Sequence, residues 1–222
     1  MIKQRRRPHP RGPRPRGADL AAVSMKEAIV EAASRCIIES GHAALSTRAV
    51  AAAAGVNQSL IHYYFGTKEG LMLAVLERMN AAILKRQSSM YEAPSRFAEK
   101  WAEACRFYEQ DLASGFVRLM AELSGLGISN PTIGAEVRKI EAQWRQLLEH
   151  VVREALAHFR IRSLRPEIAA AYLAAFWRGM ERHMVLGVPE AETHYWQSLA
   201  AVEQFLKWLE RSRRAGRRAV IV

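Results

Sequence analysis

Cysteine is scarce in this sequence, since only Cys36 and Cys105 occur among 222 residues. They lie far apart and follow no C-x-x-C or Cys/His spacing, so neither a disulfide framework nor a zinc site is indicated. Nucleophile elbows, H-E-x-x-H motifs and paired catalytic carboxylates are also missing. We therefore expect a protein that is not an enzyme, holds no metal or cofactor, and works in the reducing cytoplasm.

Long hydrophobic runs are missing as well. The longest extends from Ile168 to Trp177 and ends at Arg178, whereas a helix needs roughly 20 apolar residues to cross a bilayer. Prolines interrupt the basic N-terminus between residues 8 and 15, where a signal peptide needs an apolar stretch. The sequence therefore predicts neither a membrane span nor a secretion signal.

Acidic residues are absent from the two ends of the chain. Residues 1–17 carry seven Lys or Arg, and residues 211–218 carry five. The formal net charge of +11 falls to −1 for the rest, because 11 − 7 − 5 = −1. DNA binding by the folded part must therefore rest on a motif. For the ends, solvated tails and an N-terminal arm that enters a minor groove both remain open.

The period-two alternation of half-buried strands is also absent, while apolar residues recur at steps of three and four. We therefore predict an all-α fold, in which a three-helix N-terminal head precedes a larger helical body. The predicted parts are a disordered basic arm (1–17), the head (18–70), the body (71–213) and a basic tail (214–222).

Capping residues and glycines predict where the helices begin and end. Ser24 and Glu27 have the spacing of a capping box, so the first helix is expected from about residue 25 to Ser40. Thr67 is expected to cap a long fourth helix. The other predicted helices span residues 47–54, 58–65, 95–113, 115–127, 131–160, 165–187 and 191–213.

A helix-turn-helix pattern occupies residues 46–65, STRAVAAAAGVNQSLIHYYF, with a turn that begins at Gly55. At about 100° per residue, its second helix divides into two faces. One face attaches the helix to the head and carries Leu60, Ile61, Tyr64 and Phe65. The other face carries the hydrogen-bonding groups of Gln58, Ser59, His62 and Tyr63. A helix with this outward face can enter a DNA major groove.

Two predicted helix N-termini flank the outward face, at Thr47 and at Lys68, and offer unpaired amides to phosphates. Gln58 can pair with adenine, and Arg48 can reach a guanine edge. The complete predicted DNA-binding set is Thr47, Arg48, Gln58, Ser59, His62, Tyr63 and Lys68.

Residues 24–71, above all TRAVAAAAGVNQSLIHYYFGTKEGL, resemble the DNA-binding head of the TetR family of transcriptional regulators. The resemblance covers roughly a quarter of the chain and rests on T-x-x-x-[IV]-A-x-x-A-G-V, an aromatic Y-x-F ending and S/T-K-E/D-x-L. It implies base contacts by Arg48 and Gln58, and backbone clamping by Thr47 and Lys68. It also implies mixed base and phosphate contacts by Ser59, His62 and Tyr63. Position 62 is commonly Tyr in the family, and with His62 a phosphate contact there can depend on pH.

In the family, the last two long helices form the dimer, which implies a homodimer through residues 165–187 and 191–213 here. The small residues expected to permit close helix approach are Ala169, Ala170, Ala171, Ala174, Ala175 and Gly179. The side chains expected to interlock are Tyr172, Phe176 and Leu199. Packing of the same residues inside one subunit is the alternative.

The family also carries a small-molecule pocket between its fourth and eighth helices. The candidate lining residues are Trp101, Tyr108, Met120, Glu122, Trp144, Trp177 and Met180. Each one alone also fits an ordinary core position, but as a set they suit a flat, apolar or weakly polar ligand. Glu122 is the expected polar anchor, and rings beside an acid would also suit a quaternary amine.

These patterns together predict a homodimeric, sequence-specific DNA-binding regulator, expected to be a repressor. A small-molecule effector of unknown identity would release it from a palindrome-like double-stranded operator. Two alternatives remain: a DNA-binding architectural protein without an inducer, and a ligand-binding or interaction module that has lost DNA binding.

Overall fold

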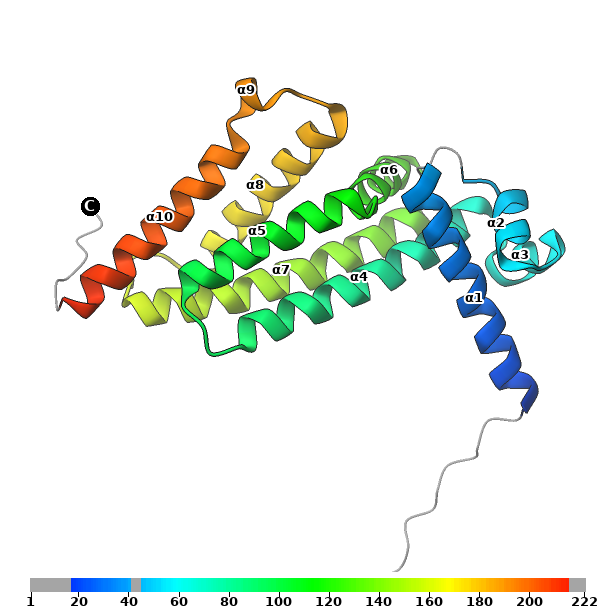
Figure 1. The fold of residues 1–222 in the computed structure, drawn as a ribbon, viewed down its shortest axis with the longest axis horizontal. Helices are drawn as coiled ribbons and strands as arrows, with labels where there is room; N and C mark the ends of the chain where they lie inside the picture. The colour runs from blue at the N-terminus through cyan, green and yellow to red at the C-terminus, as the bar shows by residue number, and fades with distance from the viewer. Residues whose placement is uncertain (1–16, 41–44, 216–222) are drawn as a thin grey trace, which may run out of the picture.

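The structure, a computed structural model, describes residues 17–40 and 45–215, with residues 17–23 described by their backbone alone. These ranges fold into ten helices and no strand, which confirms the predicted all-α class (Figure 1). Except for Gly17, Arg214 and Ala215, the predicted arm and tail lie outside the described ranges. No helix within the described ranges is both long and apolar enough to cross a membrane.

The head lies at one end of an elongated molecule (Figure 1). It consists of α1 (Gly17–Ser40), α2 (Thr47–Ala54) and α3 (Gln58–Phe65). Ile29 of α1, Val50 of α2 and Ile61 of α3 are buried in one hydrophobic cluster. Helices of eight residues, such as α2 and α3, are marginal by themselves. The buried side chains of Val50 and Ile61 hold these two helices in place.

The body contains the remaining helices, namely α4 (Lys68–Glu92), α5 (Phe97–Ala113), α6 (Phe116–Ser129), α7 (Pro131–Phe159), α8 (Pro166–Leu186), α9 (Glu190–Thr193) and α10 (Tyr195–Arg214). Of these, α4, α5 and α7 run along the long axis of the molecule in Figure 1. The helix α4 begins beside α3 and extends through the body, packing on α1, α6 and α7. The helix α4 therefore connects the body to the head.

The predicted start of the first helix near residue 25 is wrong. The helix α1 begins at Gly17, so Ser24 and Glu27 lie inside it and cannot cap it. Residues 18–23, with the sequence ADLAAV, separate Gly17 from Ser24. They include the strong helix formers Ala and Leu and no Pro or Gly. Nothing in that segment interrupts the helix before Ser24.

The prediction of one continuous helix over residues 191–213 is also wrong. The chain divides into α9 and α10 at His194, which has a left-handed backbone with φ of 51°. The Trp196 N–H donates to Glu190 Oε1 at 2.9 Å, so a side chain satisfies an amide in the first turn of α10. The break occurs without the Gly or Pro that marks most helix ends.

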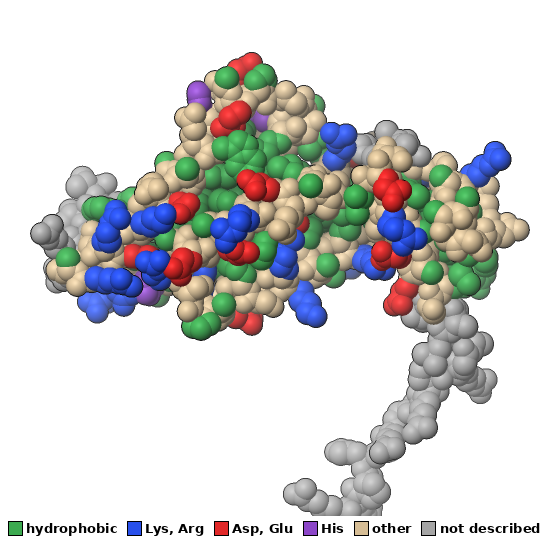
Figure 2. Space-filling model, in the orientation of Figure 1, with side chains coloured by type: hydrophobic (Ala, Val, Ile, Leu, Met, Phe, Trp, Pro, Cys, Tyr) green, Lys and Arg blue, Asp and Glu red, His purple; other side chains and the backbone are tan. Residues whose placement is uncertain are grey.

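Hydrophobic side chains gather on the surface where α8 and α10 lie (Figure 2). Tyr172 of α8 is 76% exposed. Phe205 and Trp208 of α10 are also exposed, and their rings stack with 5.7 Å between the ring centres. Ala170 and Leu199, by contrast, are buried inside the subunit. Of the residues predicted to lie between subunits, Leu199 and Ala170 therefore pack within one subunit, whereas Tyr172 remains on the surface.

Candidate functional site

Side-chain caps mark the starts of α2 and α3, and a left-handed glycine marks the end of α2. The Ser46 hydroxyl accepts from Ala49 N at 3.1 Å, and the Asn57 side chain accepts from Ser59 N at 3.0 Å. Gly55, with φ of 66°, ends α2 in the left-handed region that favours glycine. The three-residue turn between the helices is therefore specified by local sequence.

The helix α3 has one buried face and one exposed face. Ile61 is 1% exposed, whereas Tyr63 is 80% exposed. The remaining attachment residues are half-buried: Leu60, Tyr64 and Phe65. The remaining outward residues are exposed: Gln58, Ser59 and His62. The division that the angular count predicts is therefore present in the structure.

Two hydrogen bonds orient polar side chains on the exposed face of α3. Gln58 Nε2 donates to Thr47 Oγ1 at 2.8 Å, which links α3 to the start of α2. His62 Nδ1 lies 3.2 Å from Gly66 O, and because a carbonyl only accepts, this nitrogen is the donor. The Gln58 carbonyl oxygen and the His62 Nε2 therefore remain for an external partner.

The junction of α3 and α4 is unusually close. A Cβ atom on Gly70 would lie 2.1 Å from Phe65 O, so only glycine fits at this position. The Thr67 hydroxyl accepts from Gly70 N at 3.1 Å and caps α4. Lys68 follows this cap and is half-buried, while Arg48 is exposed on α2. All seven predicted DNA-binding residues thus belong to α2, α3 or the first turn of α4.

A cavity of about 230 Å³ lies in the body, between α4, α5, α6, α7 and α8. Three of the predicted pocket residues line it, namely Tyr108, Trp144 and Trp177. Gln87 and Tyr91 of α4 also contribute to its wall. The helix that leads to the head therefore borders the cavity directly.

The other four predicted pocket residues do not line the cavity. Met120 and Met180 are buried in the hydrophobic core, at 2% and 0% exposure. Trp101 donates its indole N–H to Leu199 O at 2.9 Å and contacts the Trp177 ring from outside the lining. Glu122 is half-buried on α6, away from the cavity.

Three carboxylates that were not predicted from the sequence line the cavity instead: Asp111, Glu141 and Glu181. Burial raises the pKa of Glu181, Arg178 opposes this rise, and the neighbouring Asp111 and Glu141 add to it. Burial also raises the pKa of Asp111 in spite of its ion pair with Arg86. Their spacing in the sequence could have indicated them, since each acid lies three or four residues from an aromatic residue that lines the cavity.

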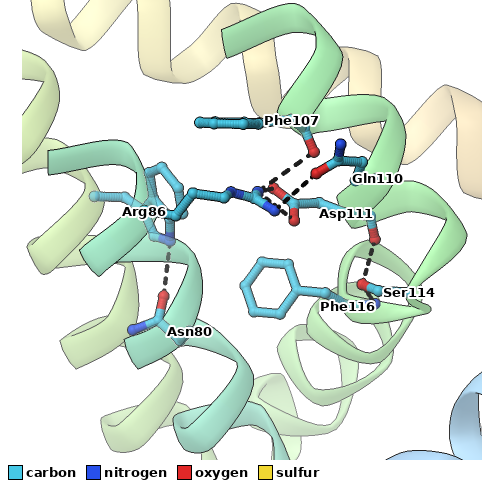
Figure 3. A network of polar contacts seen from close by, with 8 residues as sticks. Asn80, Arg86, Phe107, Gln110, Asp111, Ser114 and Phe116 are labelled. Atoms are coloured by element: carbon cyan, nitrogen blue, oxygen red, sulfur yellow. Dashed lines mark hydrogen bonds and ion pairs between the residues drawn. The ribbon is translucent and has the colours of Figure 1, made fainter. Parts of the chain in front are cut away.

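Polar contacts connect α4 to this cavity (Figure 3). Arg86 of α4 donates to both carboxylate oxygens of Asp111, and its guanidinium lies 4.2 Å from the centre of the Phe107 ring. One turn and a half earlier on α4, Asn80 accepts from the Trp144 indole N–H at 2.8 Å. Asn80 also donates to Gln143 Oε1 at 2.8 Å. Two cavity-lining side chains are therefore hydrogen-bonded to α4.

The head has clear counterparts among known proteins. Residues 29–75 match the family model described as bacterial regulatory proteins, tetR family. The head is therefore similar to the DNA-binding region of TetR-family regulators. An HTH-type transcriptional repressor of Mycobacterium tuberculosis is 38% identical over 73 residues, which span 33% of this chain and 38% of the relative. The HTH-type transcriptional regulator BetI of Rhizobium meliloti is 39% identical over 54 residues, or 24% of this chain and 27% of that relative.

The chain therefore matches these relatives over less than two fifths of their own length. Solved structures extend the likeness of fold to the body. A TetR-family regulator of Pectobacterium atrosepticum aligns with a TM-score of 0.67 at 19% identity, covering 86% of this chain and 96% of that one. A transcriptional regulator of Saccharomonospora viridis in complex with choline aligns with a TM-score of 0.64 at 19% identity, covering 83% and 94%.

Proposed function

We propose that this chain is a sequence-specific DNA-binding transcriptional regulator, acting as a repressor in the cytoplasm. The observation that carries the proposal is the exposed face of α3, where Gln58, Ser59, His62 and Tyr63 project from a helix fixed by the buried Ile61. An α-helix of this kind fits the major groove, and its amide, hydroxyl and ring groups can contact base edges. The matched relatives are named regulators, a role that needs no catalysis.

The proposed contacts follow from how the side chains are held. Gln58 keeps its carbonyl oxygen and one N–H free beside Thr47, which suits adenine. Arg48 is exposed at the rim and can reach guanine. The amides at the starts of α2 and α4 suit phosphate oxygens, with Lys68 adding a positive charge.

We propose that the cavity is an effector site and that α4 transmits its occupancy. The Arg86–Asp111 and Asn80–Trp144 contacts hold α4 against two of its walls. A ligand that displaces Asp111 or Trp144 would shift α4 and hence α3, lowering operator affinity by a change in population. The Saccharomonospora viridis regulator, which has a similar fold, was solved in complex with choline, and this supports a small-molecule effector.

We further propose a homodimer through α8 and α10. The exposed rings of Tyr172, Phe205 and Trp208 would be covered by a second copy. Gly179 of α8 also supports close helix approach, because a Cβ there meets nothing within 4 Å inside the subunit. Two heads about 34 to 36 Å apart would contact successive major grooves and select a palindrome-like site.

The dimer is tested by light scattering coupled to gel filtration. Tyr172→Arg should convert the dimer to a monomer, because a buried unpaired charge is costly at an interface. Ile128→Arg on α6 is the control, since Ile128 is 90% exposed and lies outside α8 and α10. A Tyr172→Arg protein that remains a dimer would exclude this interface.

The DNA-binding proposal is tested by selecting bound fragments from a random double-stranded library with the full chain. Enrichment of a two-half-site sequence is expected, with half-sites related by two-fold symmetry. Binding without enrichment of any sequence would instead indicate an architectural protein, and no binding at all would indicate a head that has lost this activity.

A further inference from the structure

Aromatic rings line the cavity in the body, and two of them direct their polar groups to neighbouring side chains. Tyr91, Tyr108, Trp144 and Trp177 contribute rings to its lining. The Tyr108 hydroxyl donates to the sulfur of Met184 at 3.4 Å, and the Trp144 N–H donates to Asn80. Tyr108 and Trp144 therefore present mainly hydrocarbon edges and π-faces to the cavity, which suit an apolar or positively charged surface.

The acidic side chains of the lining come from three different helices. Asp111 lies on α5, Glu141 on α7 and Glu181 on α8. Their mutual proximity is reflected in the raised pKa of Glu181, to which both other acids contribute after burial. Three acidic side chains therefore meet in a cavity that is otherwise lined mainly by aromatic and aliphatic residues.

This negative charge is only partly compensated. Arg86 pairs with Asp111, and Arg178 donates to Glu181 at 2.6 Å. Glu141 is half-buried and forms no ion pair with any residue in the part of the chain that the structure describes. Arg145 also borders the cavity, but it is exposed to solvent, which screens its charge. Of the three carboxylates, Glu141 is therefore the one without an ion pair among the described residues.

An anionic ligand would meet three carboxylates in this partly buried space and would be repelled. A neutral ligand would remove water from Glu141 without supplying a counter-charge, which is unfavourable. A cation supplies that charge and also interacts with the ring faces. The volume of about 230 Å³ is below the roughly 300 Å³ at which drug-sized sites begin, so the ligand must be compact.

We propose that the cavity binds a compact organic cation bearing an alkylated ammonium group, with Glu141 and Glu181 as counter-charges and the rings of Tyr108, Trp144 and Trp177 as walls. Alkyl substituents fit because the walls supply carboxylates and rings rather than a set of neutral acceptors. This inference rests on the proposed function, in which the same cavity is the effector site.

The charge of the ligand is tested by titration calorimetry of the full chain with three probes of nearly the same shape. These are choline, its neutral isostere 3,3-dimethylbutan-1-ol, and the carboxylate 3,3-dimethylbutanoate. Choline is expected to bind at least about tenfold more tightly than either of the others. Equal or tighter binding of the alcohol or the carboxylate would overturn the proposal. So would the absence of binding by choline, tetraethylammonium and benzyltrimethylammonium at about 1 mM.

Variants locate the counter-charge. Glu141→Gln should weaken choline binding about tenfold, and because Glu141 forms no ion pair among the described residues, folding should be retained. Glu154→Gln is the matched control on the same helix, where Glu154 lies on the exposed surface. Equal choline affinity in the Glu141→Gln and wild-type proteins would overturn the assignment of this acid.

The same titrations separate this inference from the proposed function. A protein that binds a DNA site but none of the cations contradicts the ligand class and leaves the regulator intact. A protein that binds choline through Glu141 but selects no DNA site supports the ligand class and contradicts the regulator. Choline binding without release of DNA supports the ligand class and contradicts only the proposed coupling through α4.

Discussion

Arg86 of α4 and Asp111 of α5 form an ion pair in which Nη2 lies 2.7 Å and 2.8 Å from the two carboxylate oxygens. The Phe107 ring covers the guanidinium, and Gln110 Oε1 accepts from Nη1 at 3.2 Å. Asp111 is buried and lines the cavity. The pair therefore joins a wall of the cavity to the helix that continues into the head.

Replacing Arg86 with Met should lower the free energy of unfolding by about 3 kcal/mol, because it leaves the buried Asp111 without its counter-charge. Urea denaturation at neutral pH measures this change. Lys139→Met is the control, since Lys139 pairs with Glu136 at 3.2 Å on the exposed surface of α7, where such pairs contribute below about 1 kcal/mol. Equal losses in the two variants would contradict the structural role of the Arg86 pair.

The glycines of α6 and α7 provide a steric test of the helix packing. A Cβ on Gly134 would lie 2.6 Å from Gly127 O, so Gly134→Ala should separate the helices and cost about 1 to 3 kcal/mol. Gly125→Ala meets nothing within 4 Å and should raise stability by up to about 1 kcal/mol, since alanine favours helix. Thermal denaturation of both variants checks the opposite signs. A stabilised Gly134→Ala protein would show that the two helices do not cross at this point.

The raised pKa of Glu181 predicts how stability depends on pH. Burial is the main cause, Arg178 on the same helix opposes it, and Asp111 and Glu141 on the facing helices add to it. Between the ordinary glutamate pKa and this raised value, the folded protein binds more protons than the unfolded chain, so stability falls as pH rises. Glu181→Gln should remove this component, and the urea midpoint should fall less over that range. An identical pH dependence in the Glu181→Gln and wild-type proteins would contradict the raised pKa.

The head could be predicted from the sequence because its information is local. Ser46, Gly55 and Asn57 specify the ends of α2 and α3, and the rotation of 100° per residue separates Tyr63 from Ile61. The sequence did not indicate that Gln58 would hydrogen-bond to Thr47, because that contact depends on how the two helices cross. The roles of these residues in DNA binding remain predictions.

The all-α class of the body could be predicted from the sequence, but the residues that line its cavity could not. Met120 and Met180 have the spacing of lining residues, yet the packing of neighbouring helices buries them in the core. Asp111, Glu141 and Glu181 looked like solvated residues of amphipathic helices, and only the assembly of α5, α7 and α8 brings them together. Contacts between distant helices decide such positions, and helical periodicity does not encode them.

The most direct test of the account measures the affinity of the full chain for its selected DNA site by fluorescence anisotropy. Tyr63→Ala and Arg48→Ala should each weaken binding about tenfold, because both remove an exposed group from the proposed groove-facing surface. Ile128→Ala, which changes an exposed side chain on α6, should bind as tightly as the wild type. If both Tyr63→Ala and Arg48→Ala bind the site with wild-type affinity, α3 is not the surface that reads DNA.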